Sequence, residues 1–276
     1  MGFRISVVTP SYKQVDYLKL CARSVADQVG CFTHEHLIQD GGSGVEFEQW
    51  SQAQSFADCV SEADDGMYDA INRGFSRADG DVVAWLNCDE QYLPGTLEKV
   101  AVWFQEHPEK DLLFGDVVLV DPGGVPLAYR RAVVPWRGHV RSCFLPTYSA
   151  ATFVRRKLIE GGHLLDGRFK AIADAVWIDG LLEQGFRGGV LNEPLATFTQ
   201  TGENMGQSEA GIAEGRAWRG GKGSFIRKSI WTSLHRIRKF AVGAYLRRDI
   251  SVRVFVPSSD SRVEQGASVG EKWRSH

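Results

Sequence analysis

The sequence predicts an α/β fold with a largely parallel central sheet, because short β-branched and apolar runs alternate with segments of helical periodicity. The chain has 276 residues, of which 43% are hydrophobic and 24% charged, as is ordinary for a globular protein. The formal net charge of −2 gives no reason to expect a molecule that binds polyanions as a whole. We therefore expect one large domain with a smaller appendage.

Cysteine usage and hydropathy bear on the cellular setting. The five cysteines are scattered, with no CxxC pair or other zinc-binding spacing, which indicates reduced thiols. No apolar run approaches the ~20 residues needed to cross a bilayer, and the N-terminus lacks the layout of a signal peptide. These features predict a cytoplasmic protein.

The first half of the chain alternates strands with helices. Residues 4–9 (R-I-S-V-V-T) form a β-branched, apolar run that stops at Pro10, which is typical of a buried strand. Apolar residues then recur at helical spacing from Tyr17 to Ala26. The same criteria predict the elements that follow: strand 35–39, helices 45–58 and 67–78, strand 81–86, helix 97–106 and strand 111–120.

The second half is less regular. Short apolar runs predict strands over 152–154, 188–191 and 195–198, and helical spacing predicts a helix over 174–183. Beyond residue 257 the chain is rich in Ser, Gly and charged residues, which predicts a flexible tail over 257–276.

A basic segment lies between these two regions. Between Arg216 and Arg253 there are eleven lysines and arginines against one acid, Asp249. We expect residues 213–256 to form a basic, amphipathic helical extension, whose apolar residues recur at helical spacing: Ile226, Ile230, Leu234, Ile237, Ala241 and Ala244.

The basic segment admits three interpretations. Its apolar stripe could pack on the main domain, which is the usual fate of an amphipathic helix. Alternatively, residues 216–253 could lie on the anionic inner face of the cytoplasmic membrane as a peripheral contact. No recognised nucleic-acid-binding motif accompanies the segment, so we do not expect a nucleic-acid partner.

Polar clusters follow three of the predicted strands. They are Thr9-Pro10-Ser11-Tyr12, Asp40-Gly41-Gly42-Ser43 and Asn87-Cys88-Asp89-Glu90. In an open parallel sheet, ligands bind beyond the carboxyl ends of the strands, so these clusters should face one crevice. A structural explanation, in which each cluster is only a solvated turn, requires three coincidences at the same edge.

The last cluster has the chemistry of a cation site. Mg²⁺ and Mn²⁺ take one or two carboxylates and complete their coordination with phosphate oxygens and water. Asp89 and Glu90 at a strand end could supply such a ligand, although a solvated turn is the better explanation of the pair when it is considered alone. The segment 61–74 (S-E-A-D-D-G-M-Y-D-A-I-N-R-G) adds polar groups just before and along a predicted helix.

Taken together, these motifs resemble the family 2 glycosyltransferases of the GT-A fold. The resemblance rests on T-P-S-Y at 9–12, D-G-G-S at 40–43, the segment 61–74, G-D-V-V-A-W-L-N-C-D-E at 80–90 and F-x-x-x-A-D-A-V-W at 169–177. It covers roughly residues 3–205 and is closest to the bacterial branch that builds lipopolysaccharide, capsule and exopolysaccharide.

The resemblance implies a GT-A catalytic domain over 1–212, with a nucleotide-binding half (1–120) and an acceptor half (121–212). It implies that Asp89 binds a divalent cation (Mn²⁺ or Mg²⁺), that Asp40 reads the base of the nucleotide and that Asp174 is the general base. The implied nucleotide-binding residues are Thr9, Pro10, Ser11, Tyr12, Asp40, Gly41, Glu62, Asp64, Asp69, Asn72, Arg73, Asn87 and Cys88.

The sequence departs from the family pattern at three points. Asn87 replaces the first acid of the D-x-D motif, Glu90 replaces the more usual Asp, and A-D-A-V around Asp174 lacks a second carboxylate. The Q-x-x-R-W motif of processive members is absent, which argues against a polymerising synthase.

The function that the resemblance implies is an inverting, metal-dependent transfer of one sugar in cell-surface polysaccharide biosynthesis. The donor would be a nucleotide diphosphate sugar, with UDP expected, and the acceptor a glycan or a lipid-linked molecule. The alternative is a non-catalytic nucleotide-binding or scaffold protein on the same fold. A nucleotidyltransferase is disfavoured, because T-P-S-Y-K-Q lacks a Gly-rich basic loop after the first strand.

Overall fold

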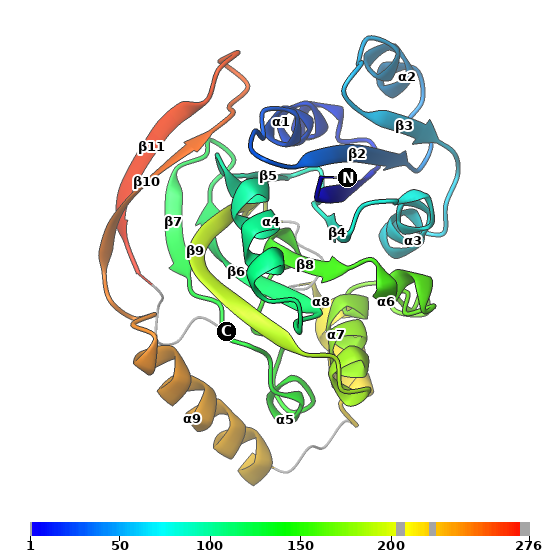
Figure 1. The fold of residues 1–276 in the computed structure, drawn as a ribbon. Helices are drawn as coiled ribbons and strands as arrows, with labels where there is room; N and C mark the ends of the chain where they lie inside the picture. The colour runs from blue at the N-terminus through cyan, green and yellow to red at the C-terminus, as the bar shows by residue number, and fades with distance from the viewer. Residues whose placement is uncertain (1, 203–207, 221–224, 271–276) are drawn as a thin grey trace.

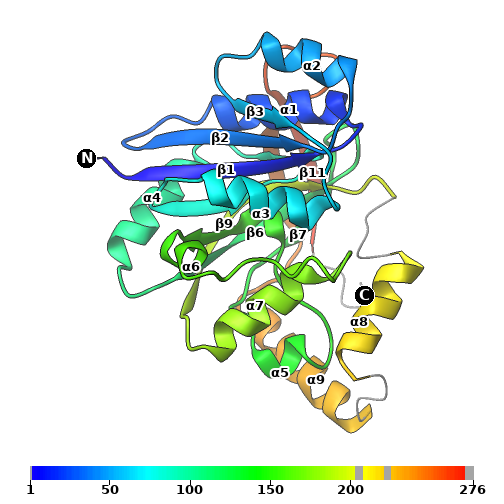
Figure 2. The same ribbon diagram turned by 90° about the vertical axis from the view of Figure 1, so that its right-hand side faces the viewer.

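The computed structural model describes residues 2–202, 208–220 and 225–270. A nine-stranded mixed sheet runs through the molecule, with helices on both faces and a separate two-stranded hairpin at one side (Figures 1 and 2). The strand order is β3-β2-β1-β4-β8-β6-β9-β5, and β7 pairs with β6. This architecture confirms the predicted α/β class.

The N-terminal half supplies four parallel strands, with the first at the centre of the group. Their bounds are β1 (Arg4–Ser11), β2 (Thr33–Asp40), β3 (Asp58–Ser61) and β4 (Val82–Trp85). The sequence analysis missed β3, and its predicted helix over 45–58 extended to the first residue of that strand. The helix α2 (Val45–Gln52) ends earlier, and β3 is a short edge strand with no buried side chain.

Successive residues of β1 face opposite layers of core. Val7 packs with α1 (Val15–Ala26) and α4 (Thr96–Glu106) on one face of the sheet. Val8 packs with α3 (Met67–Arg77) and α7 (Ala173–Glu183) on the other. Because the strand is buried on both faces, it reads in the sequence as a continuous apolar run.

The C-terminal half is built around β6 (Leu112–Val120), which is buried along its whole length. It pairs antiparallel with β7 and β8 and parallel with β9, and β9 in turn pairs with β5. The bounds of these and the short helices are β5 (Glu90–Tyr92), β7 (Pro126–Arg130), β8 (Thr152–Arg155), β9 (Gly188–Thr199), α5 (Arg137–Val140), η1 (Ser149–Ala151) and α6 (Lys157–Glu160).

The two strands predicted over 188–191 and 195–198 form the single strand β9. The register against β6 shifts between Gly115 and Asp116, where Leu191 and Pro194 are the successive partners. Asn192 and Glu193 are exposed at this irregularity, so the polar interruption in the sequence is a bulge and not a break between strands.

The C-terminal region differs from its prediction. Helix α8 (Glu209–Trp218) crosses the expected boundary at 212, and α9 spans Phe225–Ala241. The chain then forms the antiparallel hairpin of β10 (Arg248–Val254) and β11 (Val263–Val269). The predictions of a helical extension to 256 and of a flexible tail over 257–270 are therefore wrong, and residues 271–276 lie outside the described residues.

The hairpin is ordered because its alternate residues are apolar. Val252, Val254 and Val269 pack on Val118 and Val120 of β6. A bidentate ion pair between Arg262 and Asp27 at the end of α1 ties the same region to the N-terminal half, with 2.6 Å between Nε and Oδ2. The Ser and Gly content concealed this period-2 pattern in the sequence.

Helix α9 lies with its apolar stripe facing outward. Ile226, Ile230 and Ile237 are 69%, 53% and 65% exposed, whereas His235 and Lys239 are the buried residues of the helix. The stripe therefore does not pack on the domain. Within the described ranges, no helix is both long and apolar enough to cross a membrane.

Candidate active site

A cavity of about 940 Å³ opens at the carboxyl ends of β1, β2 and β4. Two of the three predicted polar clusters, together with Gly41 of the third, contribute to its lining. It extends from these strand ends past the first turn of α7 to α9. Its lining residues are Pro10, Ser11, Tyr12, Gln14, Gly41, Ala63, Asp64, Gly66, Met67, Tyr68, Ala70, Trp85, Asn87, Cys88, Asp89, Arg130, residues 144–149, Ala171, Asp174, Phe198, Gln200, Thr201, His235 and Lys239.

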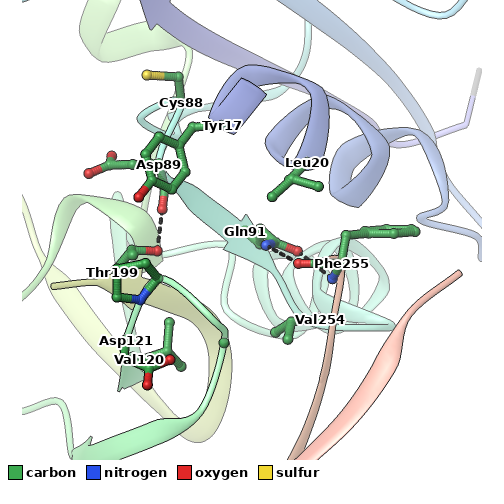
Figure 3. A pocket seen from close by; sticks show the side chains of 12 residues that line it. Tyr17, Leu20, Cys88, Asp89, Gln91, Val120, Asp121, Thr199, Val254 and Phe255 are labelled. Atoms are coloured by element: carbon green, nitrogen blue, oxygen red, sulfur yellow. Dashed lines mark hydrogen bonds between the residues drawn. The ribbon is translucent and has the colours of Figure 1, made fainter. Parts of the chain in front are cut away.

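The turn after β4 holds the residues that match the D-x-D position. The backbone N–H of Asn87 donates to Glu90 Oε2 at 2.9 Å, and the N–H of Glu90 donates to the Asn87 carbonyl at 3.0 Å. Thr199 Oγ1 donates to the Asp89 carbonyl at 2.5 Å, on the side of the turn that faces the C-terminal hairpin (Figure 3). The first two bonds close the turn and the third ties it to β9, and Asn87, Cys88 and Asp89 line the cavity.

The same turn offers oxygen ligands to a hard cation. Asn87 Oδ1 is buried and has no hydrogen-bond partner among the described residues, and it lines the cavity together with Asp89. An amide oxygen and a carboxylate fit Mg²⁺ or Mn²⁺. No cluster of three or more His, Cys, Asp or Glu side chains that could hold a metal occurs in the described part of the chain. The residues therefore fit a cation whose other ligands are phosphate oxygens and water.

Burial shapes the electrostatics of this turn. It raises the pKa of Asp89 and, with a further contribution from the Asp89 charge, raises the pKa of Glu90 well above its usual value. Glu90 is 1% exposed and does not line the cavity. It is a structural carboxyl group that closes the turn, and Asp89 is the acid that faces the ligand space.

Asp174 lies in the first turn of α7 and lines the same cavity. Its Oδ1 accepts the backbone N–H of Ala175 at 2.8 Å. Burial raises the pKa of Asp174 to about 6, and this hydrogen bond opposes the shift. A carboxylate with a pKa near neutrality is suited to act as a general base. Burial and the charge of Asp174 raise the pKa of Tyr68, which lines the cavity beside it.

Among the other predicted nucleotide-binding residues, Pro10, Ser11, Tyr12, Gly41 and Asp64 line the cavity. Asp64 Oδ1 accepts the N–H of Gly66 at 2.8 Å, which holds this carboxylate against the Gly41 backbone. A Cβ at Gly41 would lie 2.8 Å from Asp64 Oδ2, so a larger residue there would require the Asp64 side chain to move. Cys88 Sγ donates to Gln14 Oε1 at 3.1 Å.

Two predicted residues lie behind the cavity. Thr9 is fully buried and its Oγ1 lies 2.8 Å from His36 Nε2. The carboxylate of Asp40 accepts hydrogen bonds from the N–H groups of Gly42 and Ser43 and from the hydroxyls of Ser43 and Ser61. Asp40 therefore holds the loop whose residue Gly41 lines the cavity, and the predicted contact of Asp40 with the base stays a prediction.

Four other polar residues of the 61–74 segment lie outside the cavity lining. Arg73 pairs with Glu62 at 3.0 Å and with Asp69 at 2.8 Å, and it donates to the Ala63 carbonyl. Asn72 exchanges two hydrogen bonds with the backbone of Leu165. Glu62, Asp69, Asn72 and Arg73 are thus held by one another and by backbone groups beside the cavity, and their contact with a nucleotide stays a prediction.

The sequence analysis did not predict several lining residues. Met67, Tyr68 and Trp85 belong to quoted motifs, and their position beside polar motif residues was the available signal. Arg130, His235 and Lys239 are distant in sequence from the strand-end motifs. The sequence therefore gave no signal that they line the same cavity.

Comparisons with known proteins agree with this geometry. Residues 6–156 match the family described as Glycosyl transferase family 2. A PGL/p-HBAD biosynthesis glycosyltransferase of Mycobacterium tuberculosis is 34% identical over 122 residues, which cover 41% of this chain and 46% of that protein. An uncharacterized glycosyltransferase of Nostoc sp. is 27% identical over 224 residues, covering 75% of this chain and 68% of that protein. The chain thus spans about half the length of the mycobacterial relative.

Solved structures share the fold. S. aureus TarS 1-349 in complex with UDP-GlcNAc superimposes with a TM-score of 0.63 at 18% identity, covering 87% of this chain and 73% of TarS. Its complex with UDP gives a TM-score of 0.61 at 17% identity, with coverage of 87% and 72%. The family match covers more than half of the chain, and the strand-end cavity lies where the family motifs converge. The chain therefore belongs to glycosyl transferase family 2.

Proposed function

We propose that this protein is an inverting glycosyltransferase that moves one sugar from a nucleotide diphosphate donor, a UDP-sugar, to a glycan or lipid-linked acceptor in cell-surface polysaccharide biosynthesis. The observation that carries the proposal is that Asp89 and Asp174 line one cavity at the carboxyl ends of the parallel strands. The TarS structures bound to UDP-GlcNAc and UDP support the choice of donor.

In the proposed reaction, an acceptor hydroxyl oxygen attacks the anomeric carbon of the donor. A new C–O bond forms, the bond from that carbon to the diphosphate breaks, and the nucleoside diphosphate leaves. The Asp174 carboxylate takes the hydroxyl proton. Attack opposite the leaving group inverts the anomeric centre.

A divalent cation, Mn²⁺ or Mg²⁺, would supply electrostatic stabilisation for the charge that develops on the leaving diphosphate. Asp89 and the Oδ1 atom of Asn87 would hold it from the protein side. With few protein ligands, we expect the cation to bind weakly without the nucleotide and tightly with it.

We further propose that α9 rests on the anionic inner face of the cytoplasmic membrane. Its outward stripe includes Phe225, Ile226 and Phe240, which are 85%, 69% and 72% exposed. The surrounding segment carries eleven basic residues and one acid, so its charge complements anionic lipid headgroups. A lipid-linked acceptor would meet the enzyme at that surface.

The function is tested by assaying transfer and donor hydrolysis with a panel of nucleotide sugars and Mn²⁺. Asp89→Ala and Asp174→Ala should each abolish turnover, whereas the exposed Asp65→Ala should retain it. The coupling constant of the anomeric proton, measured by proton NMR, should show that the product has the anomeric configuration opposite to that of the donor. Binding of UDP without turnover by any donor would instead establish the non-catalytic alternative.

A further inference from the structure

The backbone that leads into α7 is held by a carboxylate from a distant helix. Glu214, in the middle of α8, accepts the N–H of Lys170 on Oε1 at 2.7 Å. Its Oε2 accepts the N–H groups of Ala171 and Ile172 at 2.8 and 3.1 Å. The partners lie 42 to 44 positions away in the sequence. One side chain of α8 thus engages three consecutive peptide groups of the turn over 170–172.

This turn leads directly to the proposed base. Ile172 is the residue before α7, and Asp174 lies two residues further along, in the first helical turn. Ala171 and Asp174 both line the cavity. The Asp174 side chain is in turn bonded to the N–H of Ala175, so its orientation follows the backbone. A displacement of the turn would therefore displace the Asp174 carboxylate with it.

Glu214 takes the place of a local helix cap. A helix usually begins after a Ser, Thr, Asp or Asn whose side chain accepts N–H groups that have no intrahelical partner. In α7 that position is Ile172, whose apolar side chain has no acceptor. Hydrogen bonds to a carboxylate are stronger than those between neutral groups, and a negative charge at a helix N-terminus is favoured by the helix dipole. The start of α7 is therefore coupled to α8.

Helix α8 is itself anchored to the elements around α7. Arg219, which follows α8, donates through Nε to the Val140 carbonyl at 3.1 Å. The guanidinium of Arg141 lies 4.6 Å from the centre of the Trp218 ring. Arg141 also donates to Asp179 of α7 at 2.7 Å, and Asp179 is 1% exposed. Helices α5, α7 and α8 therefore form a closed frame, and Glu214 acts from a fixed position.

The turn is also joined to the nucleotide part of the cavity. Lys170 Nζ donates to the Asp65 carbonyl at 2.8 Å. The neighbours of Asp65, Asp64 and Gly66, line the cavity. The turn over 170–172 thus lies between α8 and the segment that precedes α3, so its position sets the proposed base relative to the donor end of the cavity.

We infer that Glu214 is a positioning residue for the transfer reaction, which holds Asp174 at the acceptor hydroxyl by fixing the turn over 170–172. This inference rests on the proposed function, in which Asp174 is the base. A general base must lie within about 2.6–3.2 Å of the atom that carries the proton, and a misplacement of about 1 Å costs about a hundredfold in rate. Glu214 does not line the cavity, so it acts through the backbone.

Steady-state kinetics of Glu214→Ala test the inference, with the donor of the panel that the unsubstituted protein hydrolyses fastest. Water then takes the place of the acceptor hydroxyl. We expect kcat to fall about 10- to 100-fold, because the base is misplaced. The donor KM and the UDP affinity should stay within about threefold, because the strand-end residues are unchanged.

Two further variants make the measurement specific. Glu214→Gln should lose only about three- to tenfold in kcat, because its Oε1 can still accept the two N–H groups of Ala171 and Ile172. It is nearly isosteric and remains informative if the alanine variant does not fold, which the melting temperature shows. Glu209→Ala removes an exposed acid from the same helix and should turn over as the unsubstituted protein does.

Hydrogen–deuterium exchange followed by mass spectrometry reads the contact without turnover. The amides over 170–172 should exchange roughly tenfold faster or more in Glu214→Ala, and no faster in Glu209→Ala. Faster exchange with an unchanged kcat would show that Glu214 only attaches α8, and it would overturn the inference. An equal loss of kcat in Glu209→Ala, or a loss confined to the donor KM, would also overturn it.

Failure of the proposed function gives a different result. In that case the unsubstituted protein turns over no donor, or Asp174→Ala keeps its turnover. Either result would remove the positioning role together with the function on which it rests. Turnover that is abolished by Asp174→Ala and unaffected by Glu214→Ala would remove the positioning role alone.

Discussion

At the residue scale, the proposed chemistry depends on how Asp174 is buried. The side chain lines the cavity from the first turn of α7 and accepts a hydrogen bond from the backbone N–H of its neighbour Ala175. Burial raises the pKa of Asp174 to about 6, so at neutral pH the group is ionised yet basic enough to accept a proton. Asp174 therefore suits the proposed role of general base even though A-D-A-V lacks a second carboxylate.

This pKa sets the pH dependence of turnover. Because the carboxylate form is needed, kcat/KM should rise about tenfold per pH unit at acidic pH and level off above about pH 6, where Asp174 is ionised. A pH series of initial rates at saturating Mn²⁺ measures it. A plateau that extends down to pH 4 would show that Asp174 is not the base.

The same shift carries a cost in stability. The folded-state pKa of Asp174 is raised, so above its ordinary value the unfolded chain binds fewer protons, and stability falls as the pH rises from about 4 to about 6. Asp174→Asn should melt a few degrees higher than the unsubstituted protein at pH 8 and equally at pH 4, since ~1 kcal/mol shifts Tm by ~2–4 °C. The exposed Asp65→Asn should show no such pH-dependent difference, and equal effects in both variants would contradict the explanation.

At the element scale, the position of α3 depends on a glycine. A Cβ at Gly74 would lie 2.3 Å from Val8 Cγ1, so the helix reaches β1 only because this residue has no side chain. That close packing fixes the start of α3, where Met67 and Tyr68 line the cavity. The glycine of the R-G motif thus acts on the site through helix placement.

Gly74→Ala should destabilise the protein by about 1–3 kcal/mol, because the added methyl group overpacks the α3–β1 contact. Gly180→Ala is the matched control in α7, where a Cβ would meet no atom within 4 Å. That substitution should stabilise by about 0.5–1 kcal/mol through helix propensity. Urea unfolding monitored by circular dichroism measures both, and equal effects would show that packing at Gly74 is not limiting.

The C-terminal hairpin should also contribute to stability. Val254 is fully buried against β6, so Val254→Ala should cost roughly 2 kcal/mol in the free energy of unfolding. Val102→Ala on α4, where Val102 is 45% exposed, should change it little. A loss in Val254→Ala no larger than in this control would mean that the hairpin is loosely attached in solution.

Elements with strong local patterns were predictable from the sequence, and those defined by distant partners were not. β1 and β6 were predicted from their continuous apolar runs, and α1 and α4 from the helical spacing of their apolar residues. The edge strand β3 and the hairpin have weak patterns, because their pairing and packing partners are remote. The site divides in the same way: Asp89 and Asp174 lie in local motifs, whereas Arg130 and Lys239 meet through tertiary structure. Motif similarity also does not tell whether Asp40 faces the ligand or holds a loop.

At the scale of the whole molecule, the outward stripe of α9 predicts adsorption to membranes. The protein should co-sediment with vesicles containing phosphatidylglycerol and not with pure phosphatidylcholine vesicles, and binding should weaken as salt is raised. The double variant Ile230→Glu, Ile237→Glu should lose most of this binding, while Val102→Glu keeps it. Unchanged binding in the double variant, or dimerisation that buries the stripe, would contradict membrane docking.

The ion pair between Arg262 and Asp27 joins residues at opposite ends of the chain. During translation, Val118 and Val120 of β6 stay exposed to solvent until residue 269 has left the ribosome tunnel and the hairpin can pack on them. At ~5–20 residues per second, this interval lasts ~10 s or more, and chaperones would find an apolar target there. A nascent chain that stalled before the hairpin emerged would lack both the hairpin packing and the Arg262–Asp27 ion pair, and it would become a substrate for quality-control proteases.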